Sequence, residues 1–170
     1  MLLKNILKKF ITDCQSRRLS PRTIERYQND CQKLTAYLSQ RNIQDTRKVT
    51  TDHLRAYFAA LHENISERTG KRLSPFTTHG NYRSINTFWR WTHTNEYIAH
   101  NPMERVRPPR TPKRIIKRLS ERQLLILLDE IQRTAHPTRN RAMLLLMLDS
   151  GLRRGETVNL TIYNIHTAEK

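Results

Sequence analysis

The residues whose types and spacing could do chemistry lie near the end of the chain. An apolar run from Leu144 to Leu148 leads to Gly151, then to Arg153, with an acid three residues later at Glu156. A guanidinium is planar, permanently charged and offers paired donors, so Arg153 is suited to hold two oxygens of a phosphate. The i, i+3 spacing lets Glu156 reach Arg153 and fix its orientation. The alternative is that Arg153 and Arg154 are simply an exposed pair at a helix end.

A second group of polar side chains follows one side of a helix expected from Ser74 to about Asn95. Its members are spaced 4, 3 and 4 residues apart: His79, Arg83, Asn86 and Arg90. At 1.5 Å per residue they span roughly 17 Å, enough to lie along a DNA major groove. Arginine reads guanine and asparagine reads adenine, while other basic side chains hold phosphates. A solvated helix face without a ligand would explain the same pattern.

The net charge indicates a polyanionic partner. The 170 residues include 31 Lys and Arg against 15 Asp and Glu, a net charge of +16. Residues 1–100 carry +9, residues 101–118 carry +6 and residues 119–170 carry +1. Each cation near a nucleic-acid phosphate releases a condensed counterion, so the first two regions are the expected electrostatic footprint. RNA and anionic membrane are the competing polyanions.

The elements that must position these residues are expected to be helices. In the first, apolar residues from Leu3 to Cys14 recur at helical spacing opposite lysines, as in a core face or a membrane-surface helix. Ser20-Pro21 and Ser74-Pro75 each predict a helix start, because serine caps free N–H groups and proline suits the first turn. A further helix is expected to begin near Thr50.

A basic, proline-rich segment separates this region from the rest. Prolines disfavour a helix and stiffen the chain. We therefore expect one domain over residues 1–100, a linker over residues 101–118 and a second domain from residue 119. The linker side chains expected to follow a DNA backbone are Arg107, Arg110, Lys113, Arg114, Lys117 and Arg118. A disordered surface loop is the alternative.

The second region is expected to contain helices whose apolar faces lack part of the protein surface against which they would pack. Ser120 and Gln123 form a capping box before a leucine-rich helix, and another helix is expected over residues 138–149. Gly151 suits the left-handed position at its end. A short helix over residues 154–160 and the start of a strand at residues 161–165 follow.

Other site classes have little support in the sequence. Cys14 and Cys31 are expected to be buried free thiols in a reducing cytoplasm. The longest apolar run is too short for a membrane span, and we expect no membrane partner. No residue spacing indicates a metal or a cofactor.

Along the chain, a helical region is followed by the basic linker, the Ser120–Gln123 capping box and the Gly151 to Glu156 segment. This order of features resembles that of the tyrosine site-specific recombinases, or phage-type integrases. Leu19 to Tyr27 is similar to the second-helix entry of their core-binding domain, and Asn95 to Pro102 is similar to its exit. Gly151 to Glu156 is similar to the segment with their first catalytic arginine. The resemblance implies a mainly α fold, with a four-helix SAM-like core-binding domain followed by the first helices of a catalytic domain.

The resemblance also implies roles for individual residues. In that family a tyrosine attacks the scissile phosphate, forming a 3′-phosphotyrosyl link, and two arginines hold the non-bridging oxygens. Arg153 matches the first of these arginines and Glu156 the family's acid. The second and fourth helices of the family face DNA, which adds candidates on the second helix here: Arg22, Arg26 and Lys33. Tyr163 is interpreted as a packing residue, and the other five tyrosines as core or interface residues.

The implied function is DNA integration or recombination with double-stranded DNA as partner. The remaining catalytic residues are expected beyond Lys170, so the chain as given should not cleave DNA. Family members act as tetramers on two DNA sites, whereas this chain is expected to be monomeric. Two alternatives remain: a non-catalytic protein that occupies recombination sites, and an RNA-binding protein.

Overall fold

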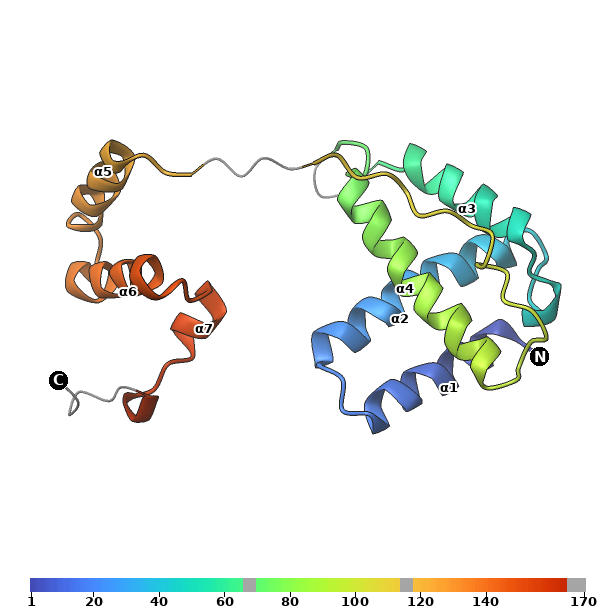
Figure 1. The fold of residues 1–170 in the computed structure, drawn as a ribbon. Coiled ribbons are helices and arrows are strands. Elements are labelled where there is room, and N and C mark those ends of the chain that lie inside the picture. The colour runs from blue at the N-terminus through green and yellow to red at the C-terminus, as the bar shows by residue number, and fades with distance from the viewer. Residues whose placement is uncertain (66–69, 114–117, 165–170) are drawn as a thin grey trace. The chain divides into compact units, whose positions relative to one another are not determined.

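The computed structural model describes residues 1–65, 70–113 and 118–164, and it divides into two compact units, Met1–Lys113 and Arg114–Lys170 (Figure 1). The described residues form seven α-helices and two short 3-10 helices, with isolated β-bridges but no strand. The prediction of a mainly α fold is therefore confirmed. None of the helices described is long and apolar enough to cross a membrane.

The first unit contains four helices that begin where the sequence predicts. They are α1 (Leu3–Ser16), α2 (Pro21–Ser39), α3 (Thr51–Glu63) and α4 (Pro75–Thr94), with a 3-10 turn at Thr46–Lys48. Ser20 accepts a hydrogen bond from the backbone N–H of Thr23, and Ser74 accepts one from that of Thr77. Each serine thus caps a helix whose first residue is proline, as the two Ser-Pro pairs indicate.

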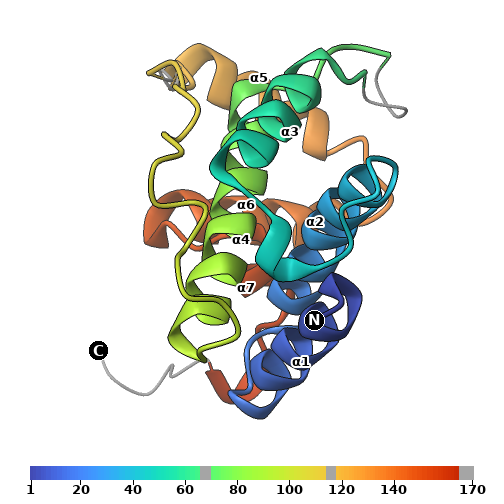
Figure 2. The same cartoon turned by 90° about the vertical axis from the view of Figure 1, so that its right-hand side faces the viewer.

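The core of this unit lies where α2 and α4 cross, with α1 and α3 packed around them (Figure 1 and Figure 2). Phe10 of α1 is at its centre, with its ring 5.5 Å from Phe88 and 5.6 Å from Tyr27. The predicted apolar face of α1 is buried here rather than exposed to solvent. Cys14 and Cys31 are buried and free, and burial raises the pKa of both thiols.

The segment after α4 packs against the first unit beyond residue 100, where the sequence predicts the end of the first domain. Met103 and Val106 are buried in the core. The Tyr82 hydroxyl donates to the carbonyl oxygen of Val106 at 2.8 Å, and the Thr51 hydroxyl donates to that of Pro102 at 3.0 Å. The first residues of the predicted linker are therefore anchored to α3 and α4, and Val106 is the last of them that is buried.

The second unit consists of short helices with little apolar burial. They are α5 (Glu121–Ile131), α6 (Pro137–Ser150) and α7 (Arg154–Val158), followed by a 3-10 turn at Ile162–Asn164. The predicted capping box is present, because Ser120 and Gln123 exchange backbone-to-side-chain hydrogen bonds. No residue of α5 or α6 is buried, which confirms the expected lack of cover.

Two expectations for the end of the chain are wrong. The predicted strand start at residues 161–165 is a 3-10 turn over its described part, because the Asn164 side chain accepts from the backbone N–H and hydroxyl of Thr161. Tyr163 is 87% exposed and does not pack. The described part of this unit offers no second layer against which its ring could lie. The other five tyrosines are buried or packed against the core, as expected.

Candidate nucleic-acid interface and arginine site

The polar side chains predicted on α4 share its outer side. Arg83 and Arg90 are exposed, and His79 and Asn86 are half-buried. The opposite side of the helix carries Ile85, Phe88 and Trp89, all of which are buried. We call His79, Arg83, Asn86 and Arg90 the α4 stripe. Packing of the apolar side thus points the α4 stripe out of the core, and α4 contains no acidic residue that would repel an anion.

The α2 candidates lie on a single side of their helix. Arg22, Arg26 and Lys33 are all exposed, and spacings of four and seven residues place them above one another. Arg26 differs from the other two because it reaches across to α4. Its Nε lies 3.7 Å from Oδ2 of Asp30, and its guanidinium lies directly over Gly80. Arg26 therefore links the two helices that carry the predicted DNA-binding residues.

A buried polar network behind Arg26 escaped the sequence analysis. Asn81 of α4 donates from Nδ2 to Oδ1 of Asp30 at 3.0 Å, and its own Oδ1 accepts from the Tyr57 hydroxyl of α3 at 3.3 Å. Burial raises the pKa of the Tyr57 phenol, which keeps it a proton donor. The network ties α2, α3 and α4 together. Two signals could have indicated it: the i, i+4 pair Arg26–Asp30 and an isolated glycine inside the α4 pattern.

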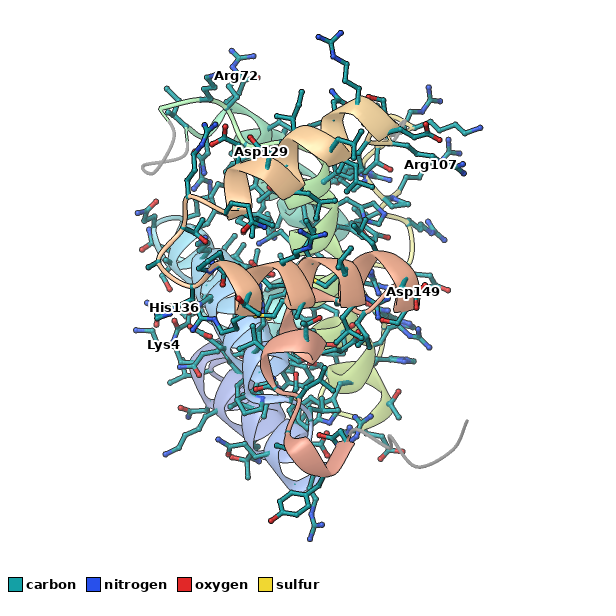
Figure 3. The ribbon with its side chains drawn as sticks, turned by 90° about the vertical axis from the view of Figure 1, so that its left-hand side faces the viewer. Lys4, Arg72, Arg107, Asp129, His136 and Asp149 are labelled. Atoms are coloured by element: carbon teal, nitrogen blue, oxygen red, sulfur yellow. The ribbon has the colours of Figure 1, made fainter. Side chains whose placement is uncertain are left out.

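The basic residues after α4 form an exposed extension of the first unit. The residues described there and at the start of the second unit are Arg107, Arg110, Lys113 and Arg118, and all four are exposed. Figure 3 labels Arg107 at the start of this extension. The other two candidates in the segment, Arg114 and Lys117, lie outside the described residues. Exposed cations without a rigid helix beneath them suit backbone phosphates better than base edges.

The arginine site of the second unit lies at the turn between α6 and α7. Figure 3 marks the two ends of α6 with His136 and Asp149. Gly151 ends this helix with φ +68°, a left-handed conformation that glycine adopts without strain, and its N–H donates to the carbonyl oxygen of Met147. The chain then turns so that Arg153 precedes the first residue of α7.

Glu156 binds Arg153 twice. Its Oε2 accepts from the Arg153 backbone N–H at 2.7 Å, and its Oε1 lies 3.2 Å from Nη1 of the guanidinium. The backbone hydrogen bond first, and then the side-chain bond, hold the pKa of Glu156 below its ordinary range. The Arg153 side chain is 86% exposed, so one edge of the guanidinium is held and its remaining donors face solvent. That arrangement can present paired donors to a phosphate.

The described residues contain no group of histidine, cysteine and acidic side chains arranged to hold a metal ion. The candidate side chains are mostly arginine, lysine and histidine, which can bind anions. The described candidates before residue 114 belong to the first unit, whereas Arg118 lies at the start of the second unit and Arg153 and Glu156 lie at its α6–α7 turn.

Two family profiles match this sequence. The profile described as "Phage integrase, N-terminal SAM-like domain" matches residues 7–75, and the one described as "Phage integrase family" matches residues 117–170. The first match covers most of α1 and all of α2 and α3. The second contains the arginine site.

Individual relatives match across both units. The chain is 28% identical over 153 residues to the tyrosine recombinase XerC of Proteus mirabilis, covering 90% of this chain and 48% of that protein. It is 31% identical over 163 residues to the tyrosine recombinase XerC of Alcanivorax borkumensis, covering 94% of this chain and 50% of that protein. The chain thus spans about half the length of the curated relatives it matches.

A solved structure agrees in fold. The integrase from mycobacterium phage Brujita superposes with a TM-score of 0.54 at 19% identity, covering 88% of this chain and 46% of that one. Since the two profiles, the relatives and the helical fold agree, the chain belongs to the phage integrase family of tyrosine recombinases.

Proposed function

We propose that this chain binds duplex DNA through α2, α4 and the basic extension after α4. The protein to which it belongs would integrate or recombine DNA through a 3′-phosphotyrosyl intermediate. The α4 stripe is the observation that carries the proposal. Arg83 and Arg90 are exposed on a rigid, well-packed helix, and neither makes an ion pair with any described residue. Unpaired arginines on such a surface are free to bind phosphates and base edges.

The distribution of charge supports the same surface. Residues 1–118 carry a net charge of +15, against +1 for residues 119–170. A duplex bound there would gain from counterion release along α2, α4 and the residues from Arg107 onward. We propose as the functional organisation a core-binding domain, predicted over residues 1–100 and extended by the packed segment to Val106, then a linker to residue 118 and a catalytic region after it.

We assign phosphate binding at the reaction centre to Arg153, with Glu156 holding it. The guanidinium would stabilise negative charge that builds up on the non-bridging oxygens in the transition state. Arg154 has a different setting, since it is the first residue of α7 and has no ion pair among the described residues. We therefore propose that Arg154 is a solvated neighbour without a role in the reaction.

Binding to random-sequence duplex DNA over a salt series tests the DNA proposal. We expect wild type to show a steep negative slope of log K against log[salt], as for about five or more neutralised phosphates. Replacing both stripe arginines, Arg83→Ala with Arg90→Ala, should weaken binding. It should also make the slope less negative by about 2, because two phosphate contacts are lost.

A matched control separates the effect of losing DNA contacts at α4 from the effect of lowering the net charge of the protein. Lys4→Ala with Lys8→Ala removes the same two charges from exposed positions of α1. We expect this pair to bind more tightly than the stripe variant. Equal losses in the two variants would contradict a specific role for α4. Wild type that ignores duplex DNA at low salt, or that prefers structured RNA in competition, would overturn the DNA proposal.

The Arg153 assignment has its own test. The Nε–Hε signals of Arg153 and Arg154 can be followed by NMR while a short duplex is added. Contact with a phosphate should shift the Arg153 signal and leave that of Arg154 in place. A shift of Arg154 alone would contradict the assignment.

Two further proposals concern the state of the chain. The two cysteines are buried and free, which suits a protein of the reducing cytoplasm. We propose that the chain by itself is a monomer and that tetramers on two DNA sites are a property of the whole protein. Light scattering with and without duplex would measure this.

A further inference from the structure

At Gly80 a side chain of α2 lies directly against the backbone of α4. It lies inside α4 and is buried, although a glycine in a helix interior costs stability relative to alanine. A Cβ built at this position would collide with Nη2 of Arg26 and lie 3.2 Å from its Cζ and 3.9 Å from its Nη1. The three atoms nearest to that Cβ position therefore all belong to the Arg26 guanidinium.

A largely buried carboxylate holds the other side of that guanidinium. The Asp30 side chain is 16% exposed, and its Oδ1 accepts from Asn81 Nδ2 at 3.0 Å. Its Oδ2 is fully buried and accepts no hydrogen bond, and the Arg26 Nε lies 3.7 Å from it. Because Asn81 is in turn bonded to Tyr57, the position of Asp30 is fixed by three helices.

Arg26 nevertheless keeps access to solvent. Its side chain is 55% exposed, and a guanidinium has five donors, only part of which face Asp30 and Gly80. An arginine that lies between Gly80 and the Asp30 carboxylate has fewer favourable rotamers than one that is free in solvent. Binding a phosphate with a preorganised side chain loses less conformational entropy than binding it with a free one.

We propose that Gly80 and Asp30 are positioning residues that hold Arg26 for a backbone phosphate at the crossing of α2 and α4. This inference rests on the proposed DNA binding and adds residues that make no DNA contact themselves. Gly80 provides the space for the guanidinium, and Asp30 provides the charge that keeps it there. Arg22 and Lys33 on the same side of α2 have no ion pair among the described residues.

The competing explanation is that Arg26, Asp30 and Gly80 only join two helices. The variant Gly80→Ala separates the two explanations. Alanine is the better helix former, and the atoms nearest to its methyl group belong to the flexible end of Arg26. We expect the urea midpoint of Gly80→Ala, followed by tryptophan fluorescence, to equal or exceed that of wild type, while Arg26 is displaced.

The experiment compares wild type, Gly80→Ala, Arg26→Ala and the double variant in duplex binding over a salt series. Each single variant should bind about 3- to 10-fold more weakly, with a slope less negative by up to about 1, as for one phosphate contact. The double variant should bind like Arg26→Ala alone, because Gly80→Ala acts only through Arg26.

Several results would overturn the inference. One is a Gly80→Ala variant that binds DNA with wild-type affinity and slope. Another is a double variant that binds more weakly than Arg26→Ala by the same factor that separates Gly80→Ala from wild type. A lowered urea midpoint would assign Gly80 a packing role instead. If wild type itself ignores duplex DNA, the proposed function fails and this inference fails with it, which is a different result from a binding wild type matched by Gly80→Ala.

The role of Asp30 is tested by whether neutralising its side chain weakens or tightens DNA binding. Removing an acid near DNA should tighten binding if only charge matters, so Asp52→Asn, at an 84% exposed side chain on α3, should tighten binding or leave it unchanged. We expect Asp30→Asn to weaken binding in spite of its lost negative charge, because Arg26 is no longer held. Tighter binding by Asp30→Asn with an unchanged urea midpoint would overturn the role of Asp30.

Discussion

The two units of this chain contain similar apolar helices but bury them to different degrees. In the first unit, α1 buries its whole apolar face, and Phe10 and Trp89 are at most 1% exposed. In the second, α5 and α6 carry a run of leucines and yet leave Leu125 at 66% and Leu148 at 46% exposed. The difference therefore does not come from composition. It comes from the number of helices that each unit can pack against one another.

The same difference separates the two arginine–carboxylate pairs. Asp30 is largely buried and fixed by side chains from α3 and α4, so Arg26 is held by tertiary structure. Among the residues that the structure describes, Glu156 is bound only by Arg153, three residues away at the start of a short helix. Held by local geometry alone, Arg153 has a defined orientation only while α7 is formed. The comparison indicates that the first unit is held by contacts between its helices and that the second depends on its local helix signals.

The largest expected effect of this difference is that the units unfold separately. Both tryptophans, Trp89 and Trp91, lie in the first unit, so their fluorescence reports on that unit alone. Circular dichroism at 222 nm reports on all helices. We expect part of the helical signal to disappear at low urea, before a cooperative fluorescence transition of the size typical of a small domain, about 5 kcal/mol or more. Coincident transitions would mean that the units stabilise each other.

The next effect concerns single leucines. Leu54 of α3 is fully buried, whereas Leu125 of α5 is 66% exposed. We expect Leu54→Ala to lower the free energy of unfolding of the first unit by about 2–5 kcal/mol, because it leaves a cavity. Leu125→Ala should change the free energy of unfolding of the second unit, followed by the helical signal, by less than about 0.5 kcal/mol. Urea titration of both variants measures this, and a large loss for Leu125→Ala would show that α5 is covered in solution.

Much of the fold follows from signals within a few residues. The spacing of apolar residues around Phe10, the Ser-Pro starts at Ser20 and Ser74, and the Ser120–Gln123 box are local, and each was predicted correctly. These features depend on helix periodicity and on capping of free N–H groups. They can be predicted from the sequence without knowing which helices pack against each other. The exposure of Arg83 and Arg90 follows in the same way, since the buried face of α4 determines the opposite one.

The rest depends on contacts between residues far apart in the sequence. Arg26 and Gly80 meet only because α2 and α4 cross at that point. Met103 is buried because the segment after α4 turns back along α3 and α4, and no periodicity marks an irregular segment as packed. Tyr163 was wrongly expected to pack, because an aromatic side chain in a sequence does not reveal whether a second layer is present to cover it.

A smaller effect compares helix caps across the units. Ser74 caps α4 and Ser120 caps α5, with hydrogen bonds of 3.1 and 3.3 Å from the backbone N–H three residues later. Replacing either serine by alanine should cost about 1 kcal/mol. We expect Ser74→Ala to shift the fluorescence transition, since α4 is part of a cooperative core. Ser120→Ala should leave that transition in place and lower the helical signal in the absence of urea. If Ser120→Ala also shifted the fluorescence transition, the two units would be coupled.

The smallest effect is on the titration of Glu156, and it tests whether the local Arg153–Glu156 pair is formed in solution. The pKa of Glu156 is held below its ordinary range, first by the Arg153 backbone N–H and then by the guanidinium. Because the folded-state pKa is the lower one, the pair favours the folded helix above the ordinary carboxyl pKa. That contribution is lost as the pH falls through the folded-state value.

Carbon-detected NMR titration of the Glu156 carboxyl measures this pKa directly. In Arg153→Ala the guanidinium is lost but the backbone N–H remains, so the pKa should rise only part of the way to its ordinary value. Arg154→Ala should leave it unchanged, since Arg154 does not contribute to the shift. A Glu156 that titrates normally in wild type would mean that α7 is not formed in solution. The orientation of Arg153 would then depend on packing that the described residues do not provide.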